Sequence, residues 1–343
     1  MNILVIGGGT GSTVVLEGIK RYKELKLKVI VAMMDDGGSN AVVRDEFGLL
    51  PLSDVRKSII ALADTQSNEV LRDLFTYRFH DSESMQGHTL GNLLMIAMTD
   101  IMGSEIGAIE MFKNMFNVRG DIIPVTLDDV RLVAEYDDGS KIVGEHRIDD
   151  PEVHKNIIKF YLDSPAKALD SALEAIRKAD FIILGPGDLY TTLIPNLLAE
   201  GVSEEIKKCK AKIVFISNLM SKIGQTRDKT QSDILNIIEG YLEKKIDYIL
   251  INSGKLPQEA YQRYIEDGEH IIEDDLHDGD GRVILRKDLI GSEPIKKQKG
   301  DKLKRSFIRH DSKKLGKQLY SIFNSEKNSL FRIINSLLSY YKD

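Results

Sequence analysis

The sequence contains a single cysteine and no excess of positive charge. Cys209 is the only cysteine among 343 residues, so the chain can form neither an intrachain disulfide, a cysteine-built zinc site nor an iron–sulfur cluster. The 53 Asp and Glu residues outnumber the 47 Lys and Arg residues, and the resulting net charge of −6 argues against a whole-protein polyanion binder. We therefore expect a cytoplasmic protein without a nucleic-acid partner.

Long apolar runs are missing as well. The longest, such as Leu93 to Met98, fall far short of the roughly 18 residues expected of a membrane span. Residues 1–7 lack the positively charged region of a signal peptide, and their apolar run is too short for its core. With 42% hydrophobic and 29% charged residues, the composition predicts a soluble globular protein with no membrane span.

What the sequence does contain is an alternation of short apolar runs and helical patterns. Residues 2–6, 27–34, 181–184, 212–217 and 248–252 are predicted strands, and each ends in a polar or glycine-rich loop. Residues from Val14 to Ile19 and from Ala166 to Ala179 have helical spacing. This order is typical of a Rossmann-like, doubly wound α/β fold with a mostly parallel sheet.

Two segments interrupt the alternation. Residues 53–118 form a helical segment with predicted helices at 53–62, 69–79 and 90–98, and the last is so apolar that we expect it to be buried. Strands predicted at 122–125, 130–136 and 141–147 indicate a small antiparallel insertion at about 122–148. Its last two strands are joined by Asp137-Asp138-Gly139-Ser140, a strong hairpin signal. The prediction is one domain over residues 1–320, followed by a C-terminal helix at 321–343.

The glycine turns after two of the predicted strands are candidate anion sites. Gly7-Gly8-Gly9-Thr10-Gly11 precedes a helix whose free amides and positive dipole end suit a phosphate, although neither G-x-G-x-x-G nor a P-loop is present. A second glycine turn, Gly185-Pro186-Gly187-Asp188, also ends a predicted strand and is followed by residues with hydroxyl groups, so it is a second candidate anion site. A purely structural turn is the alternative. In open α/β sheets, ligands bind at the carboxyl ends of the strands, so we expect four such loops to form one site.

Charged and polar residues at three further positions complete the candidate site. Asp35 and Asp36 end a strand, where they could bind a ribose or hold Mg²⁺, or simply form a turn paired with Arg44. Asp54 and Arg56 lie at the start of a predicted helix. They either contact a ligand, or Asp54 caps the helix and Arg56 is solvated. The candidate ligand-binding residues are Gly8, Gly9, Thr10, Gly11, Asp35, Asp36, Ser39, Asn40, Asp54, Arg56, His88, Asn92, Gly185, Gly187, Asp188, Tyr190, Thr191, Asn196 and Asn218.

Charge is also uneven near the C-terminus. Residues 266–280 hold eight acidic residues and no Lys or Arg, whereas residues 296–317 hold ten Lys and Arg against two Asp. Solvated surface is one interpretation, and a basic face that docks an acidic protein partner is the other. The helix over 328–340 carries an apolar face that packs either on its own core or on a second subunit, which leaves a homo-oligomer open.

Five motifs in this order resemble one family. They are Gly7-Gly8-Gly9-Thr10-Gly11, Asp35-Asp36-Gly37-Gly38-Ser39, Leu52-Ser53-Asp54-Val55-Arg56, Gly87-His88-Thr89-Leu90-Gly91-Asn92 and Gly185-Pro186-Gly187-Asp188-Leu189-Tyr190-Thr191. They resemble the YvcK-like gluconeogenesis-factor family, which is related to the 2-phospho-L-lactate transferases (CofD) of coenzyme F420 synthesis. The resemblance extends over about residues 1–320 and includes Ile308-Arg309-His310-Asp311.

The resemblance implies a cytoplasmic regulator that binds UDP-N-acetylglucosamine and is needed for gluconeogenic growth and for cell shape and wall synthesis. The alternative that it implies is an enzyme that moves a phospholactyl group from a guanylyl donor to a deazaflavin with Mg²⁺, in which Asp54 would be catalytic. Two segments depart from the family pattern. Ser221-Lys222-Ile223-Gly224-Gln225-Thr226 replaces a usual Thr-Gln-x-Gly-Glu-Thr, and Ser232-Asp233 replaces a usual Asp-His pair.

Overall fold

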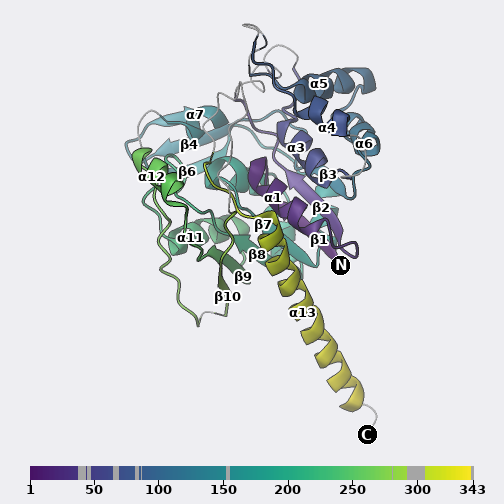
Figure 1. Ribbon diagram of the computed structural model, residues 1–343, viewed down its shortest axis with the longest axis vertical. Helices are drawn as coiled ribbons and strands as arrows, with labels where there is room; N and C mark the ends of the chain where they lie inside the picture. Colours follow the sequence, from purple (N-terminus) through teal and green to yellow (C-terminus); the bar gives the residue numbers. More distant parts are fainter. Residues whose placement is uncertain are drawn as a thin grey trace.

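A parallel sheet of seven strands forms the centre of the molecule (Figure 1). The computed structural model describes residues 1–37, 44, 48–64, 69–81, 85, 87–151, 155–279, 281–291 and 306–340, with side chains up to residue 328. Its strands are β1 (Asn2–Ile6), β2 (Lys26–Val31), β3 (Asp121–Pro124), β7 (Phe181–Leu184), β8 (Lys212–Ile216), β9 (Tyr248–Asn252) and β10 (Val283–Lys287). Their order, β10-β9-β8-β7-β1-β2-β3, confirms the predicted doubly wound α/β fold.

Helices cover both faces of the sheet because every central strand is apolar on both sides. In β1, Ile3 and Val5 pack in one core, whereas Leu4 and Ile6 pack in the other. The first core is covered by α1 (Gly9–Ile19), α3 (Ser53–Leu62), α6 (Glu105–Met115) and the start of α13 (Ser312–Tyr340). The second is covered by α8 (Asp170–Lys178), α9 (Ile194–Leu197), α10 (Val202–Lys208) and α11 (Gln231–Leu242).

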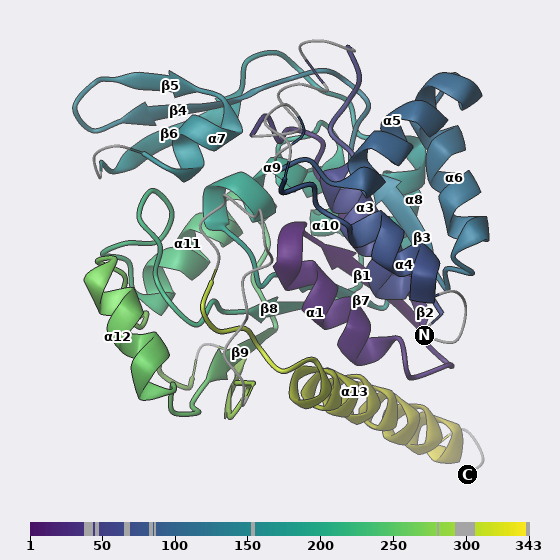
Figure 2. The same ribbon diagram turned by 45° about the horizontal axis from the view of Figure 1, so that its top comes forward.

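The predicted helical segment is present, but one of its helices is less buried than expected. It contains α3, α4 (Glu69–Thr76), α5 (Leu90–Met102) and α6. Only Gly91, Met95 and Thr99 of α5 are buried, and Ile101 is 75% exposed, so the expectation of a buried helix was wrong. The reason is position, because α4, α5 and α6 form an outer layer at the side of the molecule (Figure 2). Among the described helices, none is by itself long and apolar enough to span a membrane, and only α5 and α6 together, bent by 119°, pass on length and composition.

The small antiparallel sheet differs from the predicted insertion in two ways. It consists of β4 (Leu132–Tyr136), β5 (Lys141–Val143) and β6 (Ile157–Leu162) in the order β5-β4-β6, so β6 was missed and β3 belongs to the main sheet. The turn at Gly139 is confirmed. The predicted strand at 141–147 stops at Val143, because Gly144 has a φ of +105° and α7 (Glu145–Asp149) begins there. This helix carries two acidic side chains toward the main sheet.

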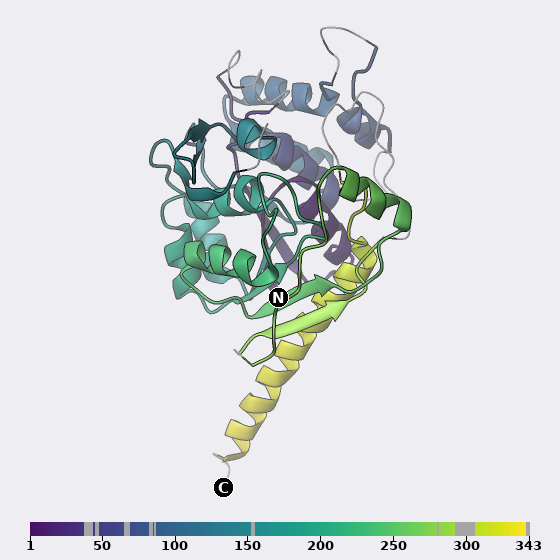
Figure 3. The same ribbon diagram turned by 90° about the vertical axis from the view of Figure 1, so that its left-hand side faces the viewer.

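The C-terminal helix begins at Ser312, well before the predicted residue 321. Its first turns lie across α1, with Leu315, Leu319 and Phe323 buried against the sheet. The rest of the helix runs away from the body of the molecule (Figure 3). The remaining elements are a short π-helix, η1 (Leu189–Leu193), and α12 (Gln258–Glu266).

Two glycines bring α1 and α13 into backbone contact. A Cβ added at Gly316 would lie 2.2 Å from the carbonyl oxygen of Gly18, and one added at Gly18 would lie 2.3 Å from the carbonyl oxygen of Ser312. No side chain fits between these helices, so the pair of glycines determines how closely α13 covers the first core.

We predict that Gly316→Ala lowers the free energy of unfolding by about 1–3 kcal/mol, because the added methyl group must push two packed backbones apart. Gly240→Ala is the matched control, since Gly240 is also helical and a Cβ there meets nothing within 4 Å. The control should raise stability by about 0.5–1 kcal/mol through helix propensity. Urea unfolding of both variants provides the measurement, and equal effects of the two substitutions would contradict the close packing.

Candidate functional site

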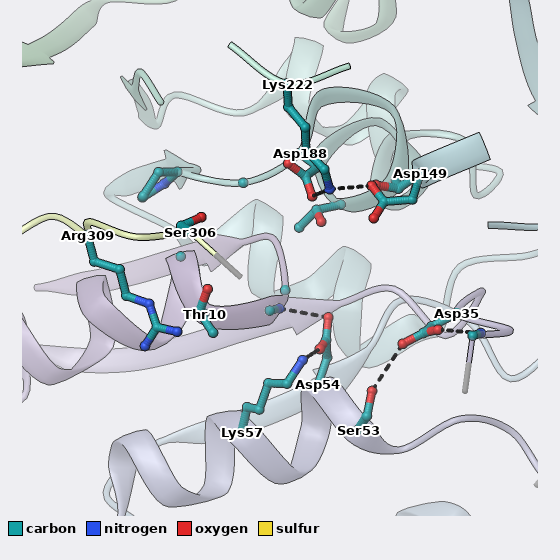
Figure 4. Close-up of a pocket in the computed structure, with 18 of the residues that line it drawn as sticks. Thr10, Asp35, Ser53, Asp54, Lys57, Asp149, Asp188, Lys222, Ser306 and Arg309 are labelled. Atoms are coloured by element: carbon teal, nitrogen blue, oxygen red, sulfur yellow. Dashed lines mark hydrogen bonds and ion pairs between the residues drawn. The ribbon is translucent and has the colours of Figure 1, made fainter. Parts of the chain in front are cut away.

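A cleft of about 600 Å³ opens at the carboxyl ends of the central strands. The loops that follow β1, β2, β7 and β8 line it, as do the starts of α3, α5 and α7 and the segment before α13. The cleft therefore lies where strand order reverses between β1 and β7, the switch point at which open α/β sheets bind ligands. Figure 4 shows polar side chains entering it from several of these elements.

The two glycine turns pack against each other at the base of the cleft. A Cβ at Gly11 would lie 1.9 Å from the carbonyl oxygen of Pro186, so only glycine allows the first turn to approach the second. Asn218, at the end of β8, fixes the second turn: its Oδ1 accepts from the Gly187 amide and its Nδ2 donates to the Gly187 carbonyl, both at 3.0 Å. Three strand ends are thus held in one rigid unit.

Asp54 lies at the start of α1 rather than capping its own helix. Its Oδ2 accepts a hydrogen bond of 2.8 Å from the Gly9 amide, and its Oδ1 accepts one of 2.7 Å from Lys57 Nζ. A Cβ at Gly8 would lie 2.1 Å from Oδ2, so this glycine is needed for the approach. The carboxylate satisfies one amide at the positive end of α1, and helix geometry leaves the amides of Thr10 and Gly11 without intrahelical acceptors.

Asp35 and Asp36 have separate partners. Asp35 accepts hydrogen bonds from the Gly37 amide at 2.9 Å and from Ser53 Oγ at 3.3 Å, and it lines the cleft. Asp36 lies behind it, accepting from the His146 amide at 2.9 Å and from Arg131 at 3.4 Å. The sequence analysis paired these acids with Arg44, but Arg44 instead binds Asp129 and the Val130 carbonyl.

Only one acid of the predicted metal pair faces the cleft. Asp36 is paired with Arg131 and its side chain is outside the cleft, which leaves the carboxylate of Asp35. In the part of the chain that the structure describes, no three His, Cys, Asp or Glu side chains are grouped so that they could hold a metal ion. A Mg²⁺ ion bound through substrate phosphates needs only one or two protein carboxylates, so the Mg²⁺ site at Asp35 and Asp36 stays a prediction.

The start of α5 forms a second polar wall. Thr89 caps the helix by accepting from the Asn92 amide, and Asn92 Oδ1 accepts a 2.7 Å hydrogen bond from Arg56 Nε. Arg56 also donates to the Phe75 carbonyl at 3.1 Å. This explains why a cation is tolerated in the first turn of α3, where the helix dipole disfavours it. His88 lines the cleft beside these residues.

An acidic end of the cleft surrounds Lys222. Its Nζ donates to Asp149 Oδ1 at 2.6 Å and to Asp188 Oδ2 at 2.8 Å, and these two carboxylates raise the pKa of Lys222. Gln225 Nε2 donates to Asp149 and to Thr191 Oγ1. The departures from the family pattern at Lys222 and Gln225 are therefore both directed at Asp149, since Lys222 compensates its charge and Gln225 donates a hydrogen bond to it.

Glu145 adds a further acid at this end. Burial and the neighbouring carboxylates of Asp35, Asp149 and Asp36 raise the pKa of Glu145 well above its usual range. Glu145 and Asp149 come from α7, which the sequence analysis expected to be partly strand, and so neither was proposed. The sequence gave little indication of their role, because acidic residues that follow a hairpin are common on protein surfaces.

The segment before α13 closes the opposite side. Ser306, Phe307, Ile308, Arg309 and His310 line it, together with Leu219, Met220 and Tyr264. Arg309 extends toward Thr10 in Figure 4. His310 is only 7% exposed, and burial lowers its pKa to about 4 despite its hydrogen bond to the backbone of Ser217. Sequence reasoning used Arg309 and His310 only as part of the family resemblance, although they lie within the site.

Most of the predicted site residues do line the cleft. They are Gly8, Gly9, Thr10, Gly11, Asp35, Asp54, Arg56, His88, Asn92, Gly187, Asp188, Thr191 and Asn218.

The structure does not place the other predicted residues in the lining. Besides Asp36, Gly185 is outside it, Tyr190 packs on Phe160 in the second core, and Asn196 is fully buried and donates to the Thr192 carbonyl. Tyr190 and Asn196 were expected to face the ligand because they follow a glycine turn at a strand end, but both belong to helices, η1 and α9, in which their side chains are buried. Ser39, Asn40 and residues 296–305 of the predicted basic face lie outside the described residues.

His310 predicts a pH dependence of stability. Because its pKa in the folded chain is about 4, below its usual 6.5, the unfolded chain binds more protons between these values and stability falls as pH falls through this window. We expect His310→Gln to remove about 3 kcal/mol of this loss between pH 6.5 and 4. Urea unfolding of both proteins across the window is the measurement, and parallel curves would contradict a buried neutral imidazole.

Comparison with known proteins agrees with this arrangement. A family model described as 2-phospho-L-lactate transferase CofD matches residues 3–290. The gluconeogenesis factor of Bacillus subtilis is 34% identical over 324 residues, which are 93% of this chain and 97% of that protein. The gluconeogenesis factor of Halalkalibacterium halodurans is 38% identical over 277 residues, 80% of this chain and 84% of its own length.

A crystal structure of a Bacillus halodurans protein has the same fold. Its TM-score is 0.83 at 33% sequence identity, and the match covers 93% of this chain and 99% of that one. The family model covers all seven strands of the main sheet and the cleft-lining segments up to Glu269. The chain therefore belongs to the CofD-related family of gluconeogenesis factors.

Proposed function

We propose that this protein binds a nucleotide sugar of the UDP-N-acetylglucosamine type in its cleft and acts as a regulator needed for gluconeogenic growth and for cell shape and wall synthesis. The observation that carries the proposal is the order of chemical groups along the cleft. In Figure 4, Arg309 and Ser306 lie on the left with Thr10 beside them, Lys222 and Asp188 lie at the top centre above Asp54, and Asp149 and Asp35 lie on the right.

The middle of the cleft suits a diphosphate. The amides of Thr10 and Gly11 at the start of α1 can donate to phosphate oxygens, and the helix dipole favours negative charge there. Lys57 and Arg309 line the same region and supply positive charge. The Gly11–Pro186 contact holds the loop rigid, so little conformational entropy is lost on binding.

The acidic end suits the hydroxyl groups of a sugar. An ionised carboxylate accepts hydrogen bonds and cannot donate them, and sugar hydroxyls are good donors. Lys222 keeps Asp149 and Asp188 in place and offsets part of their charge. Thr191 and Asn92 add neutral polar groups to the cleft. A volume of about 600 Å³ is within the usual range for small-molecule sites.

The names of the relatives support the regulatory role. Relatives that match 80% and 93% of this chain are named gluconeogenesis factors. The alternative is a transferase that moves a phospholactyl group from a guanylyl donor to a deazaflavin. The description of the matching family model favours it, and Asp54 would then deprotonate or orient the attacking hydroxyl.

Calorimetric titration of nucleotide-free protein with UDP-N-acetylglucosamine, UDP, GDP and GMP, with and without Mg²⁺, tests the proposal. We expect saturable binding of the UDP sugar that does not depend on Mg²⁺. Failure to bind any uridine nucleotide at millimolar concentration would overturn it, and Mg²⁺-dependent selectivity for guanine nucleotides would favour the transferase.

Substitution of Asp54 distinguishes the regulator from the transferase. We predict that Asp54→Asn tightens UDP-sugar binding about 5-fold, because it removes roughly 1 kcal/mol of repulsion beside the diphosphate while its amide oxygen can still accept from Gly9. A transferase would instead lose at least about 100-fold in GMP release.

The matched control is Asp64→Asn, because Asp64 is paired with Arg119 outside the cleft. It should leave the affinity unchanged. A tenfold weaker affinity of Asp54→Asn for the UDP sugar would show that the diphosphate does not lie beside Asp54.

A further inference from the structure

Two carboxylates share one ammonium group at the acidic end of the cleft. Lys222 Nζ donates to Asp149 Oδ1 at 2.6 Å and to Asp188 Oδ2 at 2.8 Å, and Figure 4 shows the three side chains pointing toward one another. Asp35 lines the cleft as well. One positive charge neutralises only one ionised carboxylate, so these four side chains together leave an excess of negative charge beside the cleft.

The three side chains of this charged group are accessible to a ligand. They line the cleft, and the exposed fraction of the side chain is 27% for Lys222, 27% for Asp149 and 31% for Asp188. Asp149 comes from α7, Asp188 from the turn before η1 and Lys222 from the loop after β8. Any group of a ligand that enters this end of the cleft therefore meets all three charges.

Glu145 indicates how this end of the cleft treats a carboxylate. It lines the cleft, and burial together with the charges of Asp35 and Asp149 raises its pKa well above the usual range. The positive charge of Lys222 acts in the opposite direction but has a smaller effect. A carboxyl group here is thus held in its uncharged form. A carboxylate of a ligand would meet the same burial and the same negative charges, and its binding would cost free energy.

The hydrogen bonds at this end suit a group that both donates and accepts. Thr191 Oγ1 and Gln225 Nε2 donate to Asp149 Oδ1 at 3.1 and 3.0 Å, as Lys222 does, which leaves Asp149 Oδ2 to accept from a ligand. Lys222 uses two of its three N–H groups on the carboxylates and can donate the third. A hydroxyl group can satisfy both partners, whereas a carboxylate can only accept.

We propose that Asp149, Asp188 and Lys222 restrict the cleft to nucleotide sugars whose sugar is uncharged, and that they reject sugar acids. Selection of this kind combines hydrogen bonds to the right ligand with repulsion of the wrong one. The inference rests on the proposed function, because it assumes that the sugar of a bound nucleotide sugar lies at the acidic end.

UDP-glucose and UDP-glucuronic acid form a matched pair of probes, because they differ only at C6, where the first has a hydroxymethyl group and the second a carboxylate. The experiment is calorimetric titration of full-length wild-type protein with both and with UDP. We expect UDP-glucose to bind at least about 10-fold more tightly than UDP-glucuronic acid. UDP should have an intermediate affinity, because it gains no sugar contact and meets no repulsion.

Substitutions of opposite charge then assign this preference to the three side chains. Asp149→Asn and Asp188→Asn each remove a negative charge and should reduce the ratio of the two affinities by at least about 3-fold. Lys222→Gln removes the positive charge and should increase the ratio by a similar factor. Asp64→Asn is the matched control, since it removes the same charge outside the cleft and should leave the ratio unchanged. Thermal unfolding of each variant checks that it is folded.

The ratio of affinities is the decisive readout, because a merely structural effect of a substitution would change the affinity for both UDP sugars by the same factor. Equal binding of the two UDP sugars by wild-type protein would overturn the inference while leaving nucleotide binding intact. So would an unchanged ratio in Asp149→Asn and Asp188→Asn. Failure of wild-type protein to bind UDP or either UDP sugar would instead overturn the proposed function.

Discussion

The contact between the two glycine turns is the constraint on which the rest of the site depends. Gly11 has no room for a Cβ against the Pro186 carbonyl, and this closeness lets the turns that follow the paired strands β1 and β7 pack against each other at the switch point of the sheet. Asn218 attaches the end of β8 to the same unit through both of its amide atoms. A rigid base of this kind lets loops from distant parts of the sequence present side chains to one ligand with little loss of entropy on binding.

Around this base the charges are arranged in compensated pairs. Asp54 is held between the Gly9 amide and Lys57, Asp36 between Arg131 and the His146 amide, and Lys222 between two carboxylates. Such pairs keep acids and bases at fixed positions without leaving isolated charges in a partly buried cleft. They also reduce the repulsion that the proposed anionic ligand would meet from Asp54 beside the α1 loop.

The cleft is acidic and polar at one end and has apolar side chains at the other, and under the proposed function this asymmetry would give a bound nucleotide a direction. The apolar wall includes Phe307 and Ile308, which belong to the segment before α13, so the C-terminal part of the chain completes a site that the N-terminal glycine loop begins. Close packing of α13 on α1 through Gly316 and Gly18 holds the two parts at a constant distance. Stability of the fold and geometry of the ligand site are therefore linked through one helix pair.

The sequence alone determined the fold class and the loops that form the site, because buried parallel strands are short apolar runs and glycine turns are required locally. It also identified Asp54, Arg56 and Asn92 as cleft residues. Only the tertiary structure decided that Arg131, and not Arg44, pairs with Asp36, that α7 brings Glu145 and Asp149 to the cleft, and that Tyr190 and Asn196 turn inward. These outcomes depend on contacts between residues far apart in the chain, and neither periodicity nor turn chemistry carries information about such contacts. His310 is the clearest case, since an isolated histidine in a sequence has no predictable role until the fold buries its side chain beside the cleft.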